Sequence, residues 1–120
     1  MDRTQDFWNQ QAEWSRATFG SDTERGPLGP LKHLEKEAKE AQTEVEKLAR
    51  KEWPSEKDTL YLKEEIADCL FLTFDAARRT GISLDDLLDT AFQKLEINKA
   101  REWPKNLPLD SAIEHVRSDA

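Results

Sequence analysis

Residues 64–77 constrain the fold most strongly, because they form an apolar run that also contains carboxylates. Read as a helix, the run has apolar side chains on every side, which is typical of a helix buried among others. Glu65 and Asp68 then lie at positions i and i+3 on one face. Because an unpaired ionised carboxylate is costly in a core, both must be protonated, paired with cations or bound to a metal ion.

The length and composition predict one domain, residues 1–120, with a single hydrophobic core. Apolar residues make up 37% and charged residues 36% of the chain, which favours long amphipathic helices with solvated outer faces. Each protomer thus has few apolar residues with which to form a hydrophobic core. We therefore expect a homo-oligomer that forms through helix faces. The formal net charge of -7 argues against nucleic-acid binding as the main function.

The chain shows no sign of export or of membrane insertion. Cys69 is the one cysteine, so no disulfide framework and no Cys/His zinc site is expected, and a reducing compartment is favoured. The first residues lack the apolar centre of a signal peptide, and no stretch approaches transmembrane length. We therefore expect a cytoplasmic protein with no membrane partner.

Apolar residues recur at helical spacing, and no segment alternates with a period of two. This pattern predicts an all-α fold. Turn-forming residues occupy almost every position of 21–30, which predicts a loop there. Ser55 or Asp58 is expected to cap the third helix. The tail, residues 105–120, is expected to hold one short helix from Ser111. The predicted main helices cover about residues 5–18, 31–52, 58–80 and 84–102.

The second predicted helix carries a heptad-like apolar seam with an acidic stripe beside it. The seam consists of Leu31, Leu34, Ala38, Ala41, Val45 and Leu48, and the stripe of Glu37, Glu40 and Glu44. The pair Glu37 and Glu40 repeats the i, i+3 spacing of Glu65 and Asp68. If the two helices face each other, these four carboxylates form a cage of oxygens, which is the ligand set that Mg²⁺ or Mn²⁺ prefers. We predict these four as metal ligands and catalytic residues.

A basic row on the fourth predicted helix suits a polyphosphate substrate. Lys94, Asn98 and Arg101 lie at i, i+4 and i+7, on one helix face. They are predicted to bind phosphate oxygens, because magnesium sites are commonly completed by substrate phosphates. The alternative for the row alone is an ordinary solvated face.

These motifs carry a family resemblance. Glu37-x-x-Glu40, then 24 residues, then Glu65-x-x-Asp68 resembles the ExxE...ExxD signature of the MazG-like superfamily of all-α nucleoside triphosphate pyrophosphohydrolases. Residues 94–101 resemble the superfamily's KxxxNxxR element, which contacts phosphates. The resemblance implies a four-helix MazG-like bundle that assembles as a homo-oligomer. One departure is Lys39-Glu40-Ala41, where the family usually has Gly-Glu-Leu.

The chain is most similar to the phage-type dATP/dGTP diphosphohydrolase branch (MazZ-like), through residues 14–20, 25–34, 75–79 and 98–104. This resemblance implies hydrolysis of a purine deoxynucleoside triphosphate to the monophosphate and pyrophosphate, with Mg²⁺ or Mn²⁺. It also implies a homodimer or homotetramer whose protomers build the sites jointly. Within this resemblance dGTP is the preferred substrate and dATP the second, and the location is the cytoplasm of the bacterial host if the protein is phage-encoded.

The base is predicted to contact the first helix and the loop after it. The acidic cage and the basic row would contact only the phosphates and cannot distinguish one base from another. This segment, in contrast, contains both aromatic rings and polar side chains. Trp14 or Phe19 is the predicted stacking surface, and for Trp14 an interface anchor is the alternative. The predicted polar contacts are Gln11, Ser15 and Lys32.

The competing interpretation is a non-enzymatic helical interaction module. In that case the carboxylates would pair with lysines and arginines at an interface. Such a module explains the apolar seam, but it does not explain two matched acidic pairs together with a basic row. A divalent-cation buffer is a poorer fit, because the sequence has no EF-hand loop.

Overall fold

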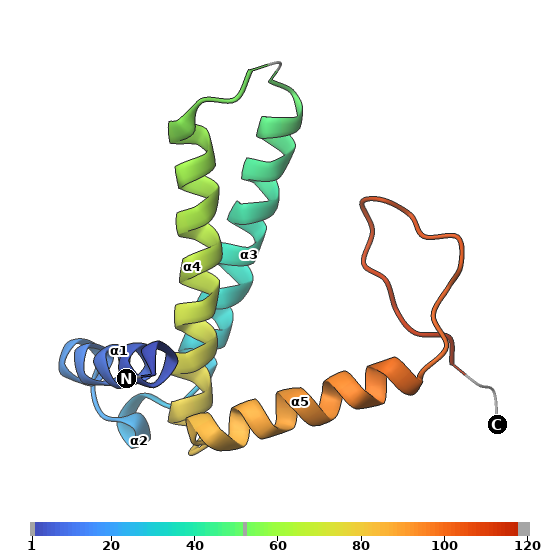
Figure 1. The fold of residues 1–120 in the computed structure, drawn as a ribbon. Helices are drawn as coiled ribbons and strands as arrows, with labels where there is room; N and C mark the ends of the chain where they lie inside the picture. The colour runs from blue at the N-terminus through green and yellow to red at the C-terminus, as the bar shows by residue number, and fades with distance from the viewer. Residues whose placement is uncertain (1, 52, 118–120) are drawn as a thin grey trace. The chain divides into compact units, whose positions relative to one another are not determined.

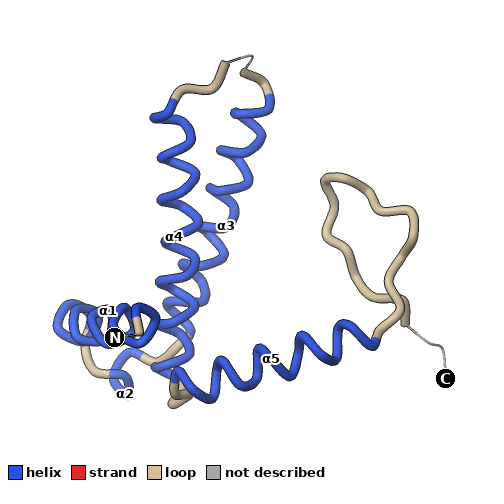
Figure 2. The backbone as a smooth tube through the Cα atoms, viewed as in Figure 1, coloured by secondary structure: helices blue, strands red, loops and turns tan. Residues whose placement is uncertain are grey.

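The computed structural model describes residues 2–51 and 53–117, and within these ranges it is helical with no strand. The all-α prediction is confirmed. Figures 1 and 2 show the course of the chain and its helices. The helices are α1 (Arg3–Phe19), α2 (Asp22–Arg25), α3 (Leu28–Ala49), α4 (Glu56–Arg79) and α5 (Leu84–Ala100).

The chain divides into two compact units, residues 1–84 and residues 85–120, and each is described by itself. In the first unit α3 and α4 form a hairpin whose two helices lie side by side, and α1 lies against the C-terminal half of α4 (Figure 1). The second unit contains α5 and the tail. The single domain and the four-helix bundle stay predictions.

Local capping explains where the helices begin. Asp2 accepts a hydrogen bond from the Thr4 amide at 2.9 Å and caps α1. Ser55 and Asp58 form a reciprocal capping box at the start of α4, as expected from the sequence. Lys51 donates to Asp58 at 2.7 Å, and this bond, together with those from Ser55, lowers the pKa of Asp58 to about 2.

The prediction of a loop over residues 21–30 is wrong. Ser21 caps the short helix α2 through a second capping box, and Gly26 at φ +67° separates α2 from α3. Ser and Asp begin helices as readily as they form turns. The helix α3 starts at Leu28, ahead of Pro30, because proline is tolerated in the first turn of a helix.

The predicted short helix from Ser111 is also absent from the tail as far as Arg117, the last residue described. A helix of so few residues is marginal without a packing partner. The tail instead folds back on the end of α5. The Val116 amide donates to the Glu102 carbonyl at 2.7 Å, and His115 packs edge-on against Trp103 with ring centroids 6.1 Å apart.

The core of the first unit lies where α1 meets α4. Trp8 and Phe74 are buried, with ring centroids 5.2 Å apart, and Phe7 packs beside Phe74 at 5.8 Å. Ala76 and Ala77 are buried in the same part of α4. Their small side chains suit the close approach of neighbouring helices.

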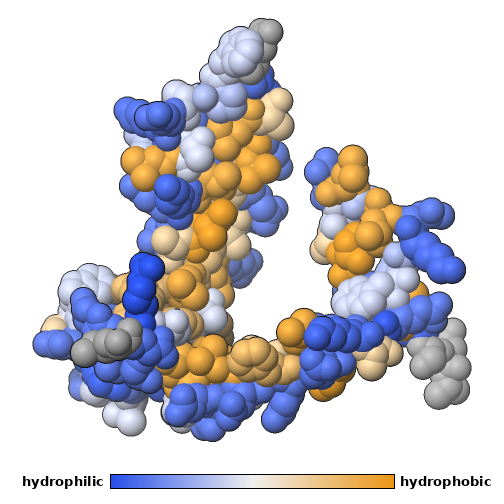
Figure 3. Space-filling view, in the orientation of Figure 1, coloured by the Kyte–Doolittle hydropathy of each residue, from blue (hydrophilic) through white to orange (hydrophobic). Residues whose placement is uncertain are grey.

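The expectation that residues 64–77 are buried on all sides is wrong for the N-terminal half of that run. Leu72 is buried, but Ile66 is 58% and Leu70 50% exposed. The reason is that α1 covers only the C-terminal half of α4. Hydrophobic surface is accordingly visible along the hairpin in Figure 3. Among the described residues, no helix combines the length and apolar character that spanning a membrane requires.

Candidate active site

Three carboxylates from the two helices of the hairpin converge. One oxygen each of Glu37 on α3, and of Glu65 and Asp68 on α4, lie within 4.8 Å of one another. Glu37 is buried, Glu65 half-buried and Asp68 exposed. The i, i+3 spacing on α4 puts its two acids on one face, and the hairpin turns Glu37 toward them.

The electrostatics of this acidic cluster are unusual. A hydrogen bond with Glu37, partial burial and the charges of Glu37, Glu40 and Asp68 raise the pKa of Glu65 to about 7. The hydrogen bond from Glu65 holds the pKa of Glu37 below its ordinary value. Glu65 Oε2 is buried and has no hydrogen-bond partner in the part of the chain that is described. Without a cation the cluster is therefore expected to hold a shared proton below about pH 7, and Glu65 Oε2 is an unsatisfied acceptor among the described residues.

Glu40 lies at the edge of the cluster. Its Oε1 is 4.0 Å from Lys36 Nζ, and its side chain is 44% exposed. An ion pair that open to solvent contributes little to stability. The Glu40 charge nevertheless helps to raise the pKa of Glu65, so the carboxylate acts electrostatically on the cluster. Its role as a fourth ligand stays a prediction.

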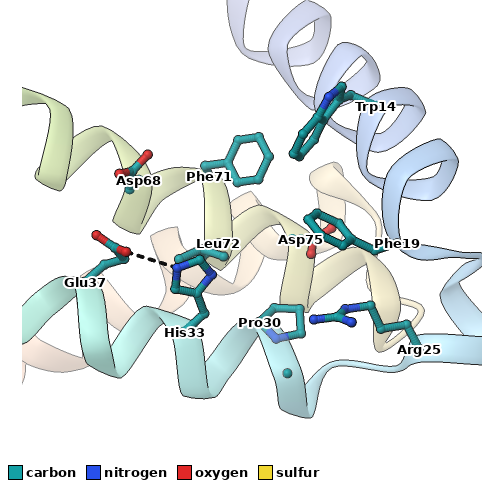
Figure 4. A pocket seen from close by; sticks show the side chains of 11 residues that line it. Trp14, Phe19, Arg25, Pro30, His33, Glu37, Asp68, Phe71, Leu72 and Asp75 are labelled. Carbon is teal, nitrogen blue, oxygen red and sulfur yellow. Dashed lines mark hydrogen bonds and ion pairs between the residues drawn. The ribbon is translucent and has the colours of Figure 1, made fainter.

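A pocket of about 420 Å³ opens beside the acidic cluster. Figure 4 shows Glu37 and Asp68 at one end and Phe19 and Arg25 at the other, with Trp14 above the aromatic end. His33 Nε2 lies 3.0 Å from Glu37 Oε1. The described residues that line the pocket are Trp14, Phe19, Arg25, Gly29, Pro30, His33, Glu37, Asp68, Phe71, Leu72 and Asp75.

The predicted stacking residues both line this pocket. Trp14 packs edge-on against Phe19 and Phe71, with ring centroids 5.4 Å and 5.5 Å apart. Trp14 is 51% and Phe19 46% exposed. Aromatic surface therefore remains accessible in the same cavity that the acidic cluster borders.

The residues predicted as polar base contacts do not line this pocket among the described residues. Lys32 is exposed and does not line the pocket among the described residues. Gln11 and Ser15 are 3% and 0% exposed, and both donate hydrogen bonds to Asp75 Oδ1, at 3.0 Å and 2.7 Å. The geometry gives Gln11 and Ser15 a structural role, because their polar atoms are already engaged inside the protein.

Asp75 is the centre of a buried polar network that the sequence interpretation missed. Arg78 donates to Asp75 and to Gln11, and Arg79 Nε lies 3.3 Å from both Asp75 oxygens. Arg79 also donates to the Ser15 hydroxyl at 2.9 Å. The network ties α1 to the end of α4. The sequence does contain a signal for this network. Asp75 interrupts an apolar run, and Arg78 and Arg79 follow it at i+3 and i+4, where they can pair with it on one helix face.

The network extends to α2 through a second carboxylate. Arg78 Nε donates to Asp22 Oδ1 at 3.1 Å, and Arg16 approaches Asp22 Oδ2 at 2.8 Å. Burial raises the pKa of Asp75, but hydrogen bonds from Gln11, Ser15 and Arg78 and the charge of Arg79 outweigh it, so that the pKa lies below its ordinary value. Asp75 is thus a satisfied ionised group in the wall of the pocket.

The predicted phosphate-binding row lies on α5, in the second unit. Arg101 donates to Asn98 Oδ1 at 3.2 Å, and Lys94 is exposed. The row and the acidic cluster belong to different units, and the role of the row toward the cluster stays a prediction.

An all-helical unit in which carboxylates converge beside an aromatic pocket has the features of a nucleotide-hydrolysing enzyme. The sequence profile of the dATP/dGTP pyrophosphohydrolase family matches residues 7–120, and the chain belongs to this family. It is therefore an enzyme of the nucleotide diphosphohydrolase class. This membership confirms the resemblance to the dATP/dGTP branch and decides against a non-enzymatic helical module.

A phage protein shares part of the sequence. The Eaa protein of Salmonella phage P22 is 51% identical over 41 residues, which make up 34% of this chain and 13% of the phage protein. The chain thus spans only a small part of that relative's length. No solved structure matches the chain.

Proposed function

We propose that the protein hydrolyses a purine deoxynucleoside triphosphate, dGTP before dATP, to the monophosphate and pyrophosphate, and that it requires Mg²⁺ or Mn²⁺. The proposal rests on one observation: the carboxylates of Glu37, Glu65 and Asp68 converge, and two of them, Glu37 and Asp68, border a pocket whose other end is aromatic. Acids at one end suit a metal–triphosphate group, and accessible rings at the other suit a base.

The residues present fit a hard divalent cation. The three carboxylates offer oxygen ligands at close range, and the buried Glu65 Oε2 lacks a partner among the described residues. A bound cation would satisfy that oxygen and remove the repulsion that raises the pKa of Glu65. Such a cation supplies Lewis-acid polarisation of a phosphoryl group. Glu37, Glu65 and Asp68 would hold it, with Glu40 as the fourth ligand.

The protein's own side chains bind and orient the rest of the substrate. Trp14 and Phe19 would stack on the base, and His33 would hold Glu37 in place through its hydrogen bond. Lys94, Asn98 and Arg101 would bind the triphosphate, because their donors offset the phosphate charge that the metal leaves uncompensated.

The active form would be a homodimer or homotetramer in the MazG-like bundle arrangement, with sites built jointly by the protomers. Exposed apolar side chains support association: Ile66 and Leu70 on α4, and Phe92, 69% exposed, on α5. A phage relative supports a location in the cytoplasm of the bacterial host.

The test is incubation of the purified protein with each deoxynucleoside and ribonucleoside triphosphate, with Mg²⁺, with Mn²⁺ and with a chelator, followed by separation of the products. The proposal predicts dGMP and pyrophosphate from dGTP at the highest kcat/KM, less from dATP, and none with the chelator. Release of orthophosphate, or turnover that the chelator leaves unchanged, would contradict it.

A further inference from the structure

Arg25 provides the positive charge at the aromatic end of the pocket. Its Cζ lies 5.0 Å from the centroid of the Phe19 ring, in a cation–π contact. Figure 4 shows the guanidinium at the opposite end of the pocket from Glu37 and Asp68. A substrate whose phosphates lie at the carboxylates would therefore bring its base, and not its phosphates, toward Arg25.

The structure leaves room for this guanidinium and anchors the helix that carries it. A Cβ at position 29 would lie 3.0 Å from Arg25 Nη2 and 3.4 Å from Cζ, so Gly29 leaves the space that the group occupies. The short helix α2, which carries Arg25, is fixed by its capping box and by ion pairs of Asp22 to Arg16 and Arg78. The helix that carries Arg25 is thus anchored beside the pocket before any ligand binds.

Its donors remain available. The neighbouring arginines are engaged, Arg16 with Asp22, Arg79 with Asp75, and Arg78 with both carboxylates. Arg25 has no ion-pair partner within residues 2–51 and 53–117. A stacked guanidinium with free N–H groups, facing an aromatic cavity, is suited to a planar acceptor pair.

We propose that Arg25 donates two hydrogen bonds to O6 and N7 of guanine, and thereby makes dGTP the better substrate. Adenine offers N7 as an acceptor, but its N6 amino group is a donor and would face another donor. The mismatch leaves a polar group unpaired when dATP binds. This inference rests on the proposed function, because the acidic end must take the phosphates.

The test measures binding of the monophosphates dGMP and dAMP by isothermal titration calorimetry, so that it does not depend on catalysis. We expect the wild-type protein to prefer dGMP, and Arg25→Ala to lower that preference roughly 5- to 150-fold, the range for one bidentate base contact. Arg50→Ala is the matched control, because Arg50 is exposed at the end of α3 and lies outside the pocket. It should keep the preference.

Base analogues separate reading of the base edge from other effects. The 7-deaza analogue of dGMP lacks N7, so the wild-type protein should bind it more weakly, whereas Arg25→Ala should bind it as it binds dGMP. The hypoxanthine analogue keeps O6 and N7 and should bind like dGMP. An unchanged dGMP preference in Arg25→Ala, or equal losses for both analogues in both proteins, would overturn the inference. Both outcomes are compatible with hydrolysis of dGTP. The proposed function is tested separately, by the hydrolysis assay described above.

Discussion

Glu37 on α3 and Glu65 on α4 share a hydrogen bond between their carboxyl groups, and the pKa of Glu65 is raised to about 7 as a result. Two helices of a protein with a net charge of -7 thus meet through groups that repel each other when both are ionised. The arrangement is unfavourable when both carboxyl groups are ionised, and under the proposed function a bound cation would offset this repulsion.

The first prediction concerns the pH dependence of stability without metal. Because the folded-state pKa of Glu65 is above its ordinary 4.5, protonated Glu65 stabilises the fold fully below pH 4.5, and this contribution is lost as pH rises through about 7. The unfolding midpoint measured in a chelator should fall by a few °C between pH 5 and pH 7.5. Glu65→Gln should fall less over this interval; an identical slope in both proteins would refute the shared-proton account.

The second prediction concerns the buried polar network. Asp75→Asn removes the charge that compensates Arg78 and Arg79, and loss of one partner from such a buried cluster costs about 3–5 kcal/mol. Urea denaturation followed by circular dichroism measures the loss. Asp89→Asn, at an exposed position of α5, should change the free energy of unfolding by less than about 0.5 kcal/mol. Equal stability of Asp75→Asn and the wild type would show that the network contributes nothing.

The position of Asp75 also shows what sequence can and cannot predict. The i, i+3 spacing of Glu65 and Asp68 follows from helix geometry, so their common face was predictable once α4 was recognised as a helix. The partners of Asp75 were not, because Gln11 and Ser15 lie 64 and 60 residues away in the sequence. Their polar side chains suggested ligand contacts, whereas packing places them inside.

Burial along α4 was unpredictable for a similar reason. Apolar residues such as Ile66 and Leu72 look alike in the sequence, yet one is exposed and the other buried. The difference arises from where α1 lies along α4, and periodicity carries no information on that position. The sequence predicts a loop at residues 21–30, where the structure has helix α2, because Ser21 and Asp22 suit both turns and helix starts.

The third prediction separates the two kinds of residue on α1. Trp14→Ala should weaken dGMP and dAMP binding alike, by about 1–3 kcal/mol, because stacking tolerates either purine. Gln11→Ala should lower the free energy of unfolding, with the ratio of the dGMP and dAMP affinities unchanged. Calorimetric titration and urea denaturation measure the two effects. A changed ratio of the dGMP and dAMP affinities in Gln11→Ala would show that Gln11 takes part in base recognition.

The fourth prediction concerns the row on α5. Arg101→Ala should weaken binding of a non-hydrolysable dGTP analogue at least about tenfold, because a charge-assisted phosphate contact is lost. It should leave dGMP binding much less affected, since the row is proposed to hold the outer phosphates. Lys99→Ala, which removes an exposed lysine paired with Glu96, is the control. Equal affinity of Arg101→Ala and the wild type for the analogue would make the row a solvated face.

The most direct test of the acidic cluster compares steady-state hydrolysis of dGTP by the wild type, Glu65→Gln and Glu64→Gln with saturating Mg²⁺. Glu64 is the exposed neighbour of Glu65 and lies outside the cluster, so its substitution controls for charge and helix position. We expect a loss of kcat/KM of roughly 100-fold or more in Glu65→Gln, with near-normal turnover in Glu64→Gln and unchanged helicity in both. Near-normal turnover by Glu65→Gln would contradict it.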